Sequence, residues 1–212
     1  IISFGYQENS DFKVSDIEID IINNSTNFYL RFDGKKEKLF INGASRHGPL
    51  NAALSVATAI YCGCPLSNIK ERLKFVDLPE RRLAISNSLR GSILIDDSYN
   101  SNPASLKNAV DSLEGLKRKK ICILGDMKEL GSDSQKIHQE MYEYISERVD
   151  QIFCIGDEWS ACSPNEKQDL FIFENQNDLY SHLISTIDKK SILLVKGSRS
   201  TRMDLLADKL KE

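Results

Sequence analysis

Residues 1–45 alternate apolar and polar residues in short runs. The alternation is clearest in FKVSDIEIDI (12–21), NFYLRF (27–32) and KLFING (38–43), with the turn signals Asn23-Asn24 and Asp33-Gly34 between them. A period of two is typical of half-buried strands, and Asp-Gly is a strong hairpin signal. The pattern predicts an antiparallel meander.

The pattern then becomes helical. Small and apolar residues recur at helical spacing from Pro49 to Cys62, which predicts a well-buried helix. A second helix is predicted over LSNIKERLKFV (66–76), with Ser67 as its N-cap. The following DLPERR (77–82) reads as a connector, so we expect a domain boundary near Leu83.

Beyond Leu83, short apolar runs alternate with helical patterns. The runs are SILIDD (92–97), KKICILGD (119–126), DQIFCIGD (150–157), DLFIFE (169–174) and SILLVKG (191–197). The segments between and after them, predicted to be mostly helical, are 103–116, 132–149, 158–167, 175–187 and 201–212. This order predicts a doubly wound, mainly parallel sheet. The fold class is therefore α/β, with a Rossmann-like domain preceded by an α+β fragment of antiparallel strands plus helices.

Composition narrows the class of protein. The chain has 212 residues and a net charge of -3, with 28 basic and 31 acidic residues. It has no sequence-wide basic field for nucleic acid or an anionic membrane, although local patches stay open. The most apolar run, residues 51–66, is too short and too interrupted to insert into a membrane. The chain begins with Ile1 and reads as a piece of a longer protein.

The cysteines indicate a reducing, cytoplasmic environment. They are five in number, and Cys122, Cys154 and Cys162 lie in apolar stretches. Cys62 and Cys64 form a CxC without the second ligand pair that a zinc site needs, so no metal site is expected.

Standard nucleotide-binding motifs are missing. The strand-end loops contain neither the G-x-G-x-x-G turn of dinucleotide-binding proteins nor the G-x-x-x-x-G-K-[ST] phosphate-binding loop. We therefore expect neither a nicotinamide nor a flavin cofactor.

The loop DDSYNSNP (96–103) is the most specific feature. In a doubly wound sheet, ligands bind beyond the carboxyl ends of the strands. There Asp97 could accept hydrogen bonds from a ribose diol, with Tyr99 packed on the sugar or base. The structural alternative is that Asp97 and Asn102 only cap the helix starting near Pro103.

Histidines give weaker signals. His47, with Arg46 and Asn51, flanks the start of the buried helix, where a nucleotide could bind or where His47 could be a structural hydrogen bonder. His138 and His182 are predicted to be surface or half-buried residues of amphipathic helices.

Together these motifs resemble the C-terminal half of the Mur ligases, most closely the MurF type. The resemblance rests on SRHGPLNAALS (45–55), IDDSYNSNPASLKNAV (95–110), ILGDMKELG (123–131) with His138 after it, and LLVKGSRSTRM (193–203). It implies that residues 1–82 are the end of the central ATP-binding domain and residues 83–212 the C-terminal Rossmann-like domain.

The resemblance also implies an activity. A Mur ligase of this type uses ATP and Mg²⁺ to join D-alanyl-D-alanine to UDP-N-acetylmuramoyl-tripeptide through an acyl phosphate, in peptidoglycan synthesis. The phosphate-binding loop and magnesium ligands would precede Ile1, so this chain alone is predicted to be inactive. The full-length protein is expected to be a cytoplasmic monomer. The alternatives are a non-catalytic Rossmann-like binding module and another amide ligase of the Mur and folylpolyglutamate synthase superfamily.

Roles follow by matching position. The resemblance implies that His47 and Asn51 contact adenine, that Asp97 binds the ribose hydroxyls, that Tyr99 lies beside the nucleotide, and that Arg81 or Arg82 reaches the phosphates. It also implies that four residues face D-alanyl-D-alanine: Lys196, Gly197, Ser198 and Arg199. Two residues depart from the family pattern, since Gly48 replaces the usual Asn and Ser45 the usual Gly.

Overall fold

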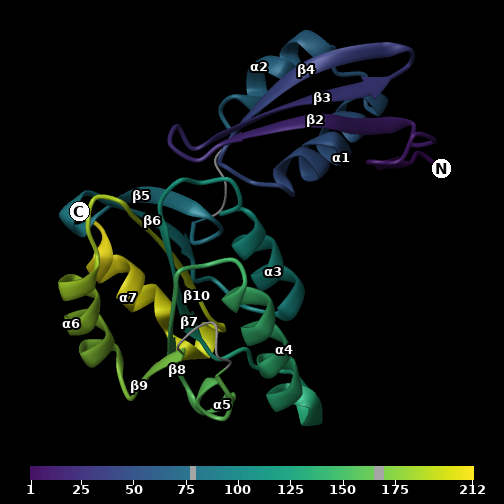
Figure 1. Ribbon diagram of the computed structural model, residues 1–212. Coiled ribbons are helices and arrows are strands. Elements are labelled where there is room, and N and C mark those ends of the chain that lie inside the picture. The colour runs from purple at the N-terminus through teal and green to yellow at the C-terminus, as the bar shows by residue number, and fades with distance from the viewer. Residues whose placement is uncertain (77–79, 165–169) are drawn as a thin grey trace. The chain divides into compact units, whose positions relative to one another are not determined.

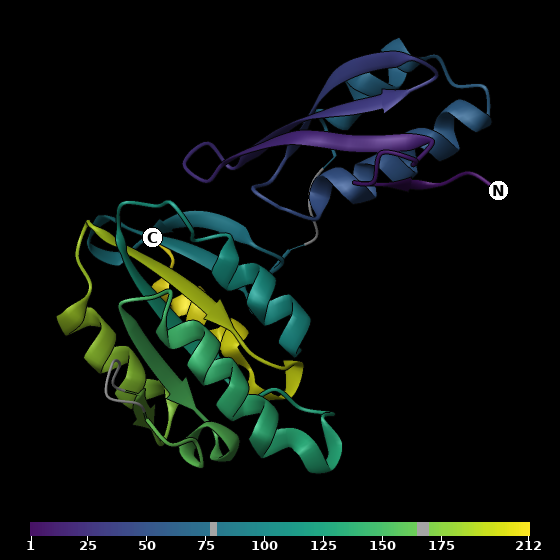
Figure 2. The same cartoon turned by 45° about the vertical axis from the view of Figure 1, so that its right-hand side comes forward.

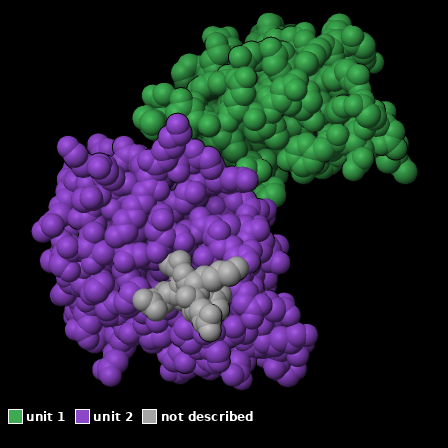
Figure 3. Space-filling model, viewed as in Figure 1, with its two compact units in different colours: residues 1–79 green, residues 80–212 purple. Residues whose placement is uncertain are grey.

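The computed structural model describes residues 1–76, 80–164 and 170–212. It divides into two compact units, Ile1–Pro79 and Glu80–Glu212 (Figure 3). The predicted connector 77–82 and the predicted segment 158–167 lie partly outside the described residues. Each unit has a hydrophobic core of its own.

A four-stranded sheet forms the first unit. Its strands, in both chain and spatial order, are β1 (Phe4–Gly5), β2 (Phe12–Asp20), β3 (Ser25–Phe32) and β4 (Lys35–Asn42). β2, β3 and β4 are antiparallel. β1 pairs with β2 in parallel, so the predicted meander is wrong for this strand. The chain folds back through a turn in which the Ser10 N–H donates to the Gln7 carbonyl, and β2 then runs in the same direction as β1.

Two helices, α1 (Gly48–Tyr61) and α2 (Leu66–Leu73), complete this unit. The core places Phe28 and Leu30 of the sheet against Ala53 and Val56 of α1, all four fully buried. Pro65, and not Ser67, occupies the N-cap position of α2, so the predicted cap is wrong. The Ser67 hydroxyl lies inside the first turn, where it contacts the side chain of Asn68.

The second unit is built on a six-stranded sheet of order β5-β6-β10-β7-β8-β9. The strands are β5 (Ala84–Ser88), β6 (Ser92–Asp97), β7 (Lys119–Gly125), β8 (Gln151–Ile155), β9 (Leu170–Phe173) and β10 (Ser191–Lys196). β6 to β10 pair in parallel, as predicted. β5 was not predicted, because the polar run SNS gives it little strand character; it pairs antiparallel with β6.

Helices cover both faces of this sheet (Figures 1 and 2). They are α3 (Pro103–Asp111), α4 (Ser134–Ser146), α5 (Asp157–Ser160), α6 (Gln176–Thr186) and α7 (Met203–Leu210), with single 3-10 turns at Leu89–Gly91, Gly131–Asp133 and Arg199–Thr201. α3 and α4 lie on one face, and α6 and α7 on the other. Coverage of both faces explains why every residue of β10 is buried.

All five cysteines are free thiols, with Cys62 and Cys64 exposed and Cys122, Cys154 and Cys162 buried. None of the helices in the described residues is long and apolar enough to cross a membrane.

Candidate functional site

The carboxyl ends of β6, β10 and β7 bring the predicted strand-end residues together. Because these neighbouring strands are parallel, Lys196 lies opposite both Asp97 of β6 and Leu124 of β7. The loops that follow the three strands therefore meet at one edge of the sheet, called the carboxyl edge below.

Asp97 and Lys196 form a buried ion pair at this edge. Lys196 Nζ lies 2.5 Å from Asp97 Oδ2 and donates to the Asn100 carbonyl at 2.8 Å. The other oxygen, Asp97 Oδ1, accepts the Leu83 N–H at 3.1 Å. Burial raises the pKa of Asp97, and the Lys196 ammonium and the Leu83 N–H offset part of the rise. The Lys196 side chain is only 2% exposed, so it orients Asp97 and does not project into solvent.

Asn102, and not Asp97, caps the following helix. The Asn102 side chain accepts the Ser105 N–H at 2.8 Å, and the Ser105 hydroxyl accepts the Asn102 N–H at 3.1 Å. This capping box satisfies the start of α3 without help from Asp97. The alternative prediction, that Asp97 and Asn102 only cap this helix, is therefore confirmed for Asn102 and wrong for Asp97.

Arg81 and Arg82 have different surroundings. The Arg81 guanidinium forms ion pairs with Asp208 at 2.9 Å and with Asp204 at 3.4 Å, both on α7. Arg82 is exposed, and its guanidinium lies 4.5 Å from the centre of the half-exposed Tyr99 ring. Arg82 and Tyr99 therefore form an accessible pair beside Asp97, whereas Arg81 is engaged with α7.

Asp96 is an anchor within the protein. It is fully buried, and its Oδ1 accepts both the hydroxyl and the N–H of Ser98, at 2.5 and 3.2 Å. Lys211 Nζ lies 3.0 Å from its Oδ2. These contacts attach the loop after β6 to the end of α7, so Asp96 is not exposed for a ligand.

A hollow of about 480 Å³ opens beside this loop. It is lined by Asn100, Lys128, Glu129, Ser198, Arg199, Ser200 and Arg202. The two loops that shape it are joined, because the Lys128 N–H donates to Ser198 Oγ at 2.8 Å and the Ser198 N–H to the Asp126 carbonyl at 3.1 Å. Its cationic side chains, Lys128, Arg199 and Arg202, form ion pairs with Asp126 at 2.9 Å and with Asp204 at 3.6 and 3.3 Å. All three are at least 47% exposed, so they can also reach an anionic group such as a carboxylate or phosphate. Sequence reasoning missed Lys128 and Arg202, although both lie inside the quoted motifs.

Gly197 has a packing role in this edge. A Cβ atom at this position would lie 2.6 Å from Met203 Cγ and 3.1 Å from the Gly125 Cα. The ends of β10 and β7 can therefore approach each other only because Gly197 has no side chain.

His138 is fully buried, so its prediction as a surface or half-buried residue is wrong. Its Nε2 accepts the Met127 N–H at 3.0 Å, and its Nδ1 lies 2.8 Å from the Ser134 carbonyl. The ring also meets Trp159 edge-on at 4.8 Å. This residue holds the loop that carries Asp126 and Lys128. The signal in the sequence that could have indicated this role of His138 is its position shortly after GDMKELG.

In the first unit, His47 and Asn51 lie at the start of α1, and both are exposed. His47 is the N-cap residue, and its carbonyl accepts the N–H groups of Leu50 and Asn51, both at 3.1 Å. Its side chain makes no capping hydrogen bond. Both side chains therefore remain accessible.

Ser45 and Gly48, which depart from the family pattern, interact with each other. Ser45 Oγ accepts the Gly48 N–H at 3.0 Å. A Cβ atom at Gly48 would lie 2.5 Å from Ile41 Cδ1 and 3.3 Å from Ser45 Cβ. Packing against Ile41 thus explains why a residue without a side chain stands at this position.

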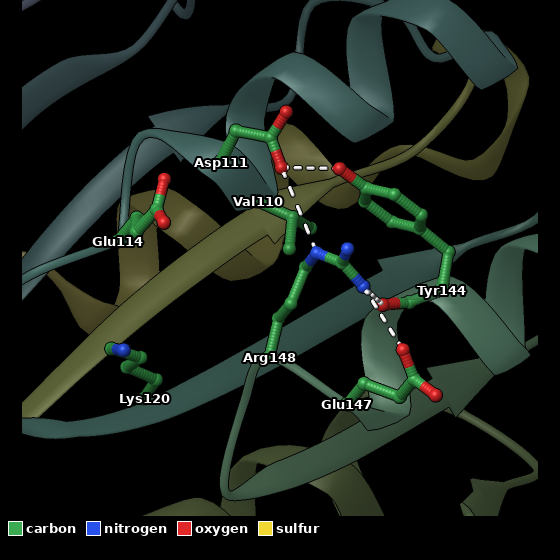
Figure 4. A pocket seen from close by; sticks show the side chains of 7 residues that line it. All are labelled: Val110, Asp111, Glu114, Lys120, Tyr144, Glu147 and Arg148. Carbon is green, nitrogen blue, oxygen red and sulfur yellow. Dashed lines mark hydrogen bonds and ion pairs between the residues drawn. The ribbon is translucent and has the colours of Figure 1, made fainter.

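A second hollow, of about 440 Å³, lies beside the start of β7 (Figure 4). Arg148 Nη1 donates to the Tyr144 carbonyl at 2.7 Å, and its guanidinium lies over the Tyr144 ring. The Tyr144 hydroxyl donates to Asp111, which raises the pKa of Tyr144. These contacts join α4 to the end of α3, so we assign them a structural role.

In the described parts of the chain, no group of three or more His, Cys, Asp or Glu residues could hold a metal ion. The carboxyl edge offers a buried, oriented carboxylate, an accessible aromatic and arginine, and a cationic hollow.

A doubly wound sheet with these groups at its carboxyl edge defines a Rossmann-like ligand-binding domain. The sequence matches the family described as "Mur ligase, glutamate ligase domain" over residues 81–199. The chain belongs to the Mur ligase family.

Named relatives extend this result. The chain is 32% identical over 173 residues to the UDP-N-acetylmuramoyl-tripeptide--D-alanyl-D-alanine ligase of Haemophilus influenzae, covering 78% of the chain and 37% of the relative. It is 33% identical over 210 residues to the same ligase of Buchnera aphidicola subsp. Acyrthosiphon pisum, covering 96% and 45%. The structure of MurF from Acinetobacter baumannii superimposes with a TM-score of 0.83 at 29% identity, over 98% of the chain and 46% of that protein. The chain spans less than half the length of these relatives.

Proposed function

We propose that this chain is part of an ATP-dependent ligase that joins D-alanyl-D-alanine to UDP-N-acetylmuramoyl-tripeptide in peptidoglycan synthesis. Relatives in two organisms bear the name of this activity, and one aligns over nearly the whole chain. In this proposal residues 1–82 end the central ATP-binding domain, and residues 83–212 form the C-terminal domain. The full-length protein would act as a cytoplasmic monomer.

The arrangement of Asp97, Tyr99 and Arg82 is the observation that carries the proposal. Asp97 is held by Lys196 and Leu83, so its carboxylate is oriented before a ligand arrives. Such a carboxylate can accept hydrogen bonds from a ribose diol, while Tyr99 packs beside the nucleotide. Arg82 is better placed than Arg81 to reach the phosphates, because Arg81 is paired with Asp204 and Asp208. His47 and Asn51 would contact adenine.

The hollow lined by Lys128, Ser198, Arg199 and Arg202 would receive the carboxylate of D-alanyl-D-alanine. Lys196 and Gly197 would contribute indirectly, Lys196 through Asp97 and Gly197 through the packing of the strand ends. The dipeptide amine would then be oriented toward the activated tripeptide.

The proposed reaction has two steps. The terminal carboxylate of the tripeptide takes the γ-phosphoryl group of ATP, which forms an acyl phosphate and releases ADP. The amine of D-alanyl-D-alanine then attacks the acyl carbon, and inorganic phosphate leaves as the peptide bond forms. This chain would supply the ribose, phosphate and dipeptide contacts. We assign the phosphate-binding loop and the Mg²⁺ ligands to the part of the protein before Ile1.

Arg82→Ala in the full-length protein tests the assignment. Arg82 makes an accessible stacking contact, so its loss should leave the fold intact, whereas Asp97→Ala would also break a buried ion pair. We expect the KM for ATP to rise roughly 10- to 100-fold, the loss typical of a charge-assisted hydrogen bond. Phosphate release with tripeptide, D-alanyl-D-alanine, ATP and Mg²⁺ measures it. Arg72→Ala, at an exposed position of α2, is the matched control.

Two results would count against the proposal. An Arg82→Ala protein with the same KM for ATP as the Arg72→Ala control would remove Arg82 from the site. If Asp97→Asn also left ligation unchanged, a non-catalytic Rossmann-like module would be the better description. The chain of 212 residues alone should release no phosphate; turnover by it would overturn the division of roles between the two parts.

A further inference from the structure

Basic residues gather at the opposite end of the second unit's sheet, where β6, β10 and β7 begin. These strands start at Ser92, Ser191 and Lys119. Because they are parallel, the segments that precede them meet at one edge. The basic residues there, called the basic edge below, are Arg90, Lys117, Arg118, Lys119, Lys120, Lys189 and Lys190.

Hydrogen bonds to main-chain carbonyls hold the segments of the basic edge side by side. The Lys119 N–H donates to the Lys190 carbonyl at 2.9 Å, and Arg118 Nη1 donates to the Lys189 carbonyl at 2.7 Å. The turn containing Arg90 adjoins them, since a Cβ at Gly91 would lie 3.5 Å from Lys189 Cβ. The clustering is therefore a product of the fold, because the segments are far apart in the sequence.

The basic edge carries a concentrated positive charge in a chain whose net charge is -3. Asp150 and Asp188 are the acidic residues lining its hollow of about 530 Å³. Both carboxylates accept main-chain N–H groups, from Lys120 at 2.7 Å and from Lys190 at 2.8 Å. Among the described residues, no salt bridge involves a basic-edge side chain.

The chemistry of this surface selects among anionic partners. Aromatic side chains, on which the bases of single-stranded nucleic acid stack, are absent from the lining residues of this hollow. Its apolar lining residue, Leu116, is half-buried and offers no anchor for a protein partner. The basic side chains are exposed or half-exposed, mostly lysines, and lysine is a flexible point charge without the geometry of a single-anion pocket. Of the possible partners, one with many spread-out and mobile negative charges fits the basic edge best.

We propose that the basic edge binds the surface of a bilayer that contains anionic phospholipids. The contact would be peripheral, through lysine ammonium groups and lipid phosphates, and without insertion. Since the basic edge and the carboxyl edge lie at opposite ends of the same parallel strands, a bilayer at the basic edge would leave the carboxyl edge of this unit open. The inference does not depend on the ligase assignment.

Vesicle co-sedimentation of the full-length protein tests the proposal. We expect binding to mixed phosphatidylglycerol–phosphatidylcholine vesicles, little binding to pure phosphatidylcholine, and loss of binding as salt is raised. Each basic residue near an anionic surface strengthens binding about fivefold, so Lys119→Gln/Lys190→Gln should weaken it about 25-fold. Lys35→Gln/Lys136→Gln removes the same charge outside the basic edge and should bind almost as the unchanged protein does.

Several outcomes would overturn the proposal. These are equal binding to both vesicle types, no binding to anionic vesicles at low salt, and equal effects of the two double variants. Displacement from vesicles by single-stranded RNA at lower concentration than by soluble phosphate would assign the basic edge to nucleic acid instead. Circular dichroism of both variants checks that the fold is unchanged.

Discussion

The pairing of Lys196 with Asp97 decides how both residues can act. Lys196 is almost completely buried, and its ammonium group is used by Asp97 and by the Asn100 carbonyl. A buried ion pair of this kind contributes little net stability compared with a hydrophobic pair, but removing one partner is costly. The role of Lys196 is therefore to keep Asp97 ionised and oriented.

Lys196→Met should destabilise the protein by about 3–5 kcal/mol at neutral pH, because Asp97 stays buried without a counter-charge. Loss of Lys196 raises the pKa of Asp97 further above the unfolded value of about 3.9. A carboxyl group with a higher pKa in the folded than in the unfolded protein favours folding at low pH. The loss of stability in Lys196→Met should therefore become smaller as the pH falls from the pKa of Asp97 in the folded protein towards its pKa in the unfolded protein. Urea unfolding at several pH values measures this.

The double variant Asp97→Asn/Lys196→Met is the control for this prediction. It removes both charges while nearly preserving the side-chain volumes, so it should recover most of the stability and lose the pH dependence. A Lys196→Met protein as stable as the unchanged protein at neutral pH would show that the pair is not buried as described.

Sequence reasoning located the candidate residues of the second unit better than their contacts. It singled out the loop that carries Asp97 and Tyr99 as a candidate, because a polar loop after an apolar strand is visible as a pattern. It could not distinguish Arg81 from Arg82, because Asp204 and Asp208, which engage Arg81, lie more than a hundred residues away. The burial of His138 is also a product of packing, since its partner Trp159 belongs to another helix.

At the level of elements, the start of α1 depends on a close contact with β4. Gly48 lies against Ile41, and its N–H is satisfied by Ser45 Oγ. The contact sets the position of the helix end that carries His47 and Asn51.

Gly48→Ala should cost about 1–3 kcal/mol, because the new Cβ would clash with Ile41 Cδ1. Ile41→Val removes that methyl group and alone should cost about 0.5–1.5 kcal/mol. If the clash is the cause, the double variant should be more stable than the sum of the two single losses predicts. Chemical denaturation of the four proteins gives the coupling, and strict additivity would contradict the clash.

Element types were predictable where periodicity was strong, and least predictable at short elements. The apolar runs of the second unit became parallel strands, and the Ala-rich segment became α1. β1 and β5 were not predicted correctly, because a two-residue strand and a polar strand form through pairing with neighbouring strands and not through a local sequence pattern. The prediction of Ser67 as the N-cap residue is wrong because Pro65 already provides the extended residue before α2.

At the scale of the molecule, each unit packs a separate core. The first unit buries one face of its sheet under α1 and α2, and the second buries both faces of its sheet. The buried cysteines Cys122, Cys154 and Cys162 all belong to the second unit, whereas Cys62 and Cys64 are exposed in the first. The slow reaction of the buried thiols can therefore report on the opening of the second unit.

Two of the five thiols should react rapidly with a disulfide reagent at mildly alkaline pH. Burial raises the pKa of Cys122 to about 12 and that of Cys162 to about 11, so both stay protonated and inaccessible. Burial also raises the pKa of Cys154. We expect these three to react only when the second unit opens. Time-resolved thiol titration, with Cys62→Ser/Cys64→Ser as control, measures this; a third rapidly reacting thiol would contradict it.

By itself, the sequence determined the α/β class, most of the strands and helices, and the loop that carries Asp97 and Tyr99, because periodicity and strand-end polarity are local properties. Tertiary structure decided which charges meet. It paired Lys196 with Asp97, engaged Arg81 with two carboxylates of α7 and brought the basic edge together from separate segments. These outcomes depend on strand order, and a parallel sheet places side by side residues that lie about a hundred positions apart, as with Asp97 and Lys196.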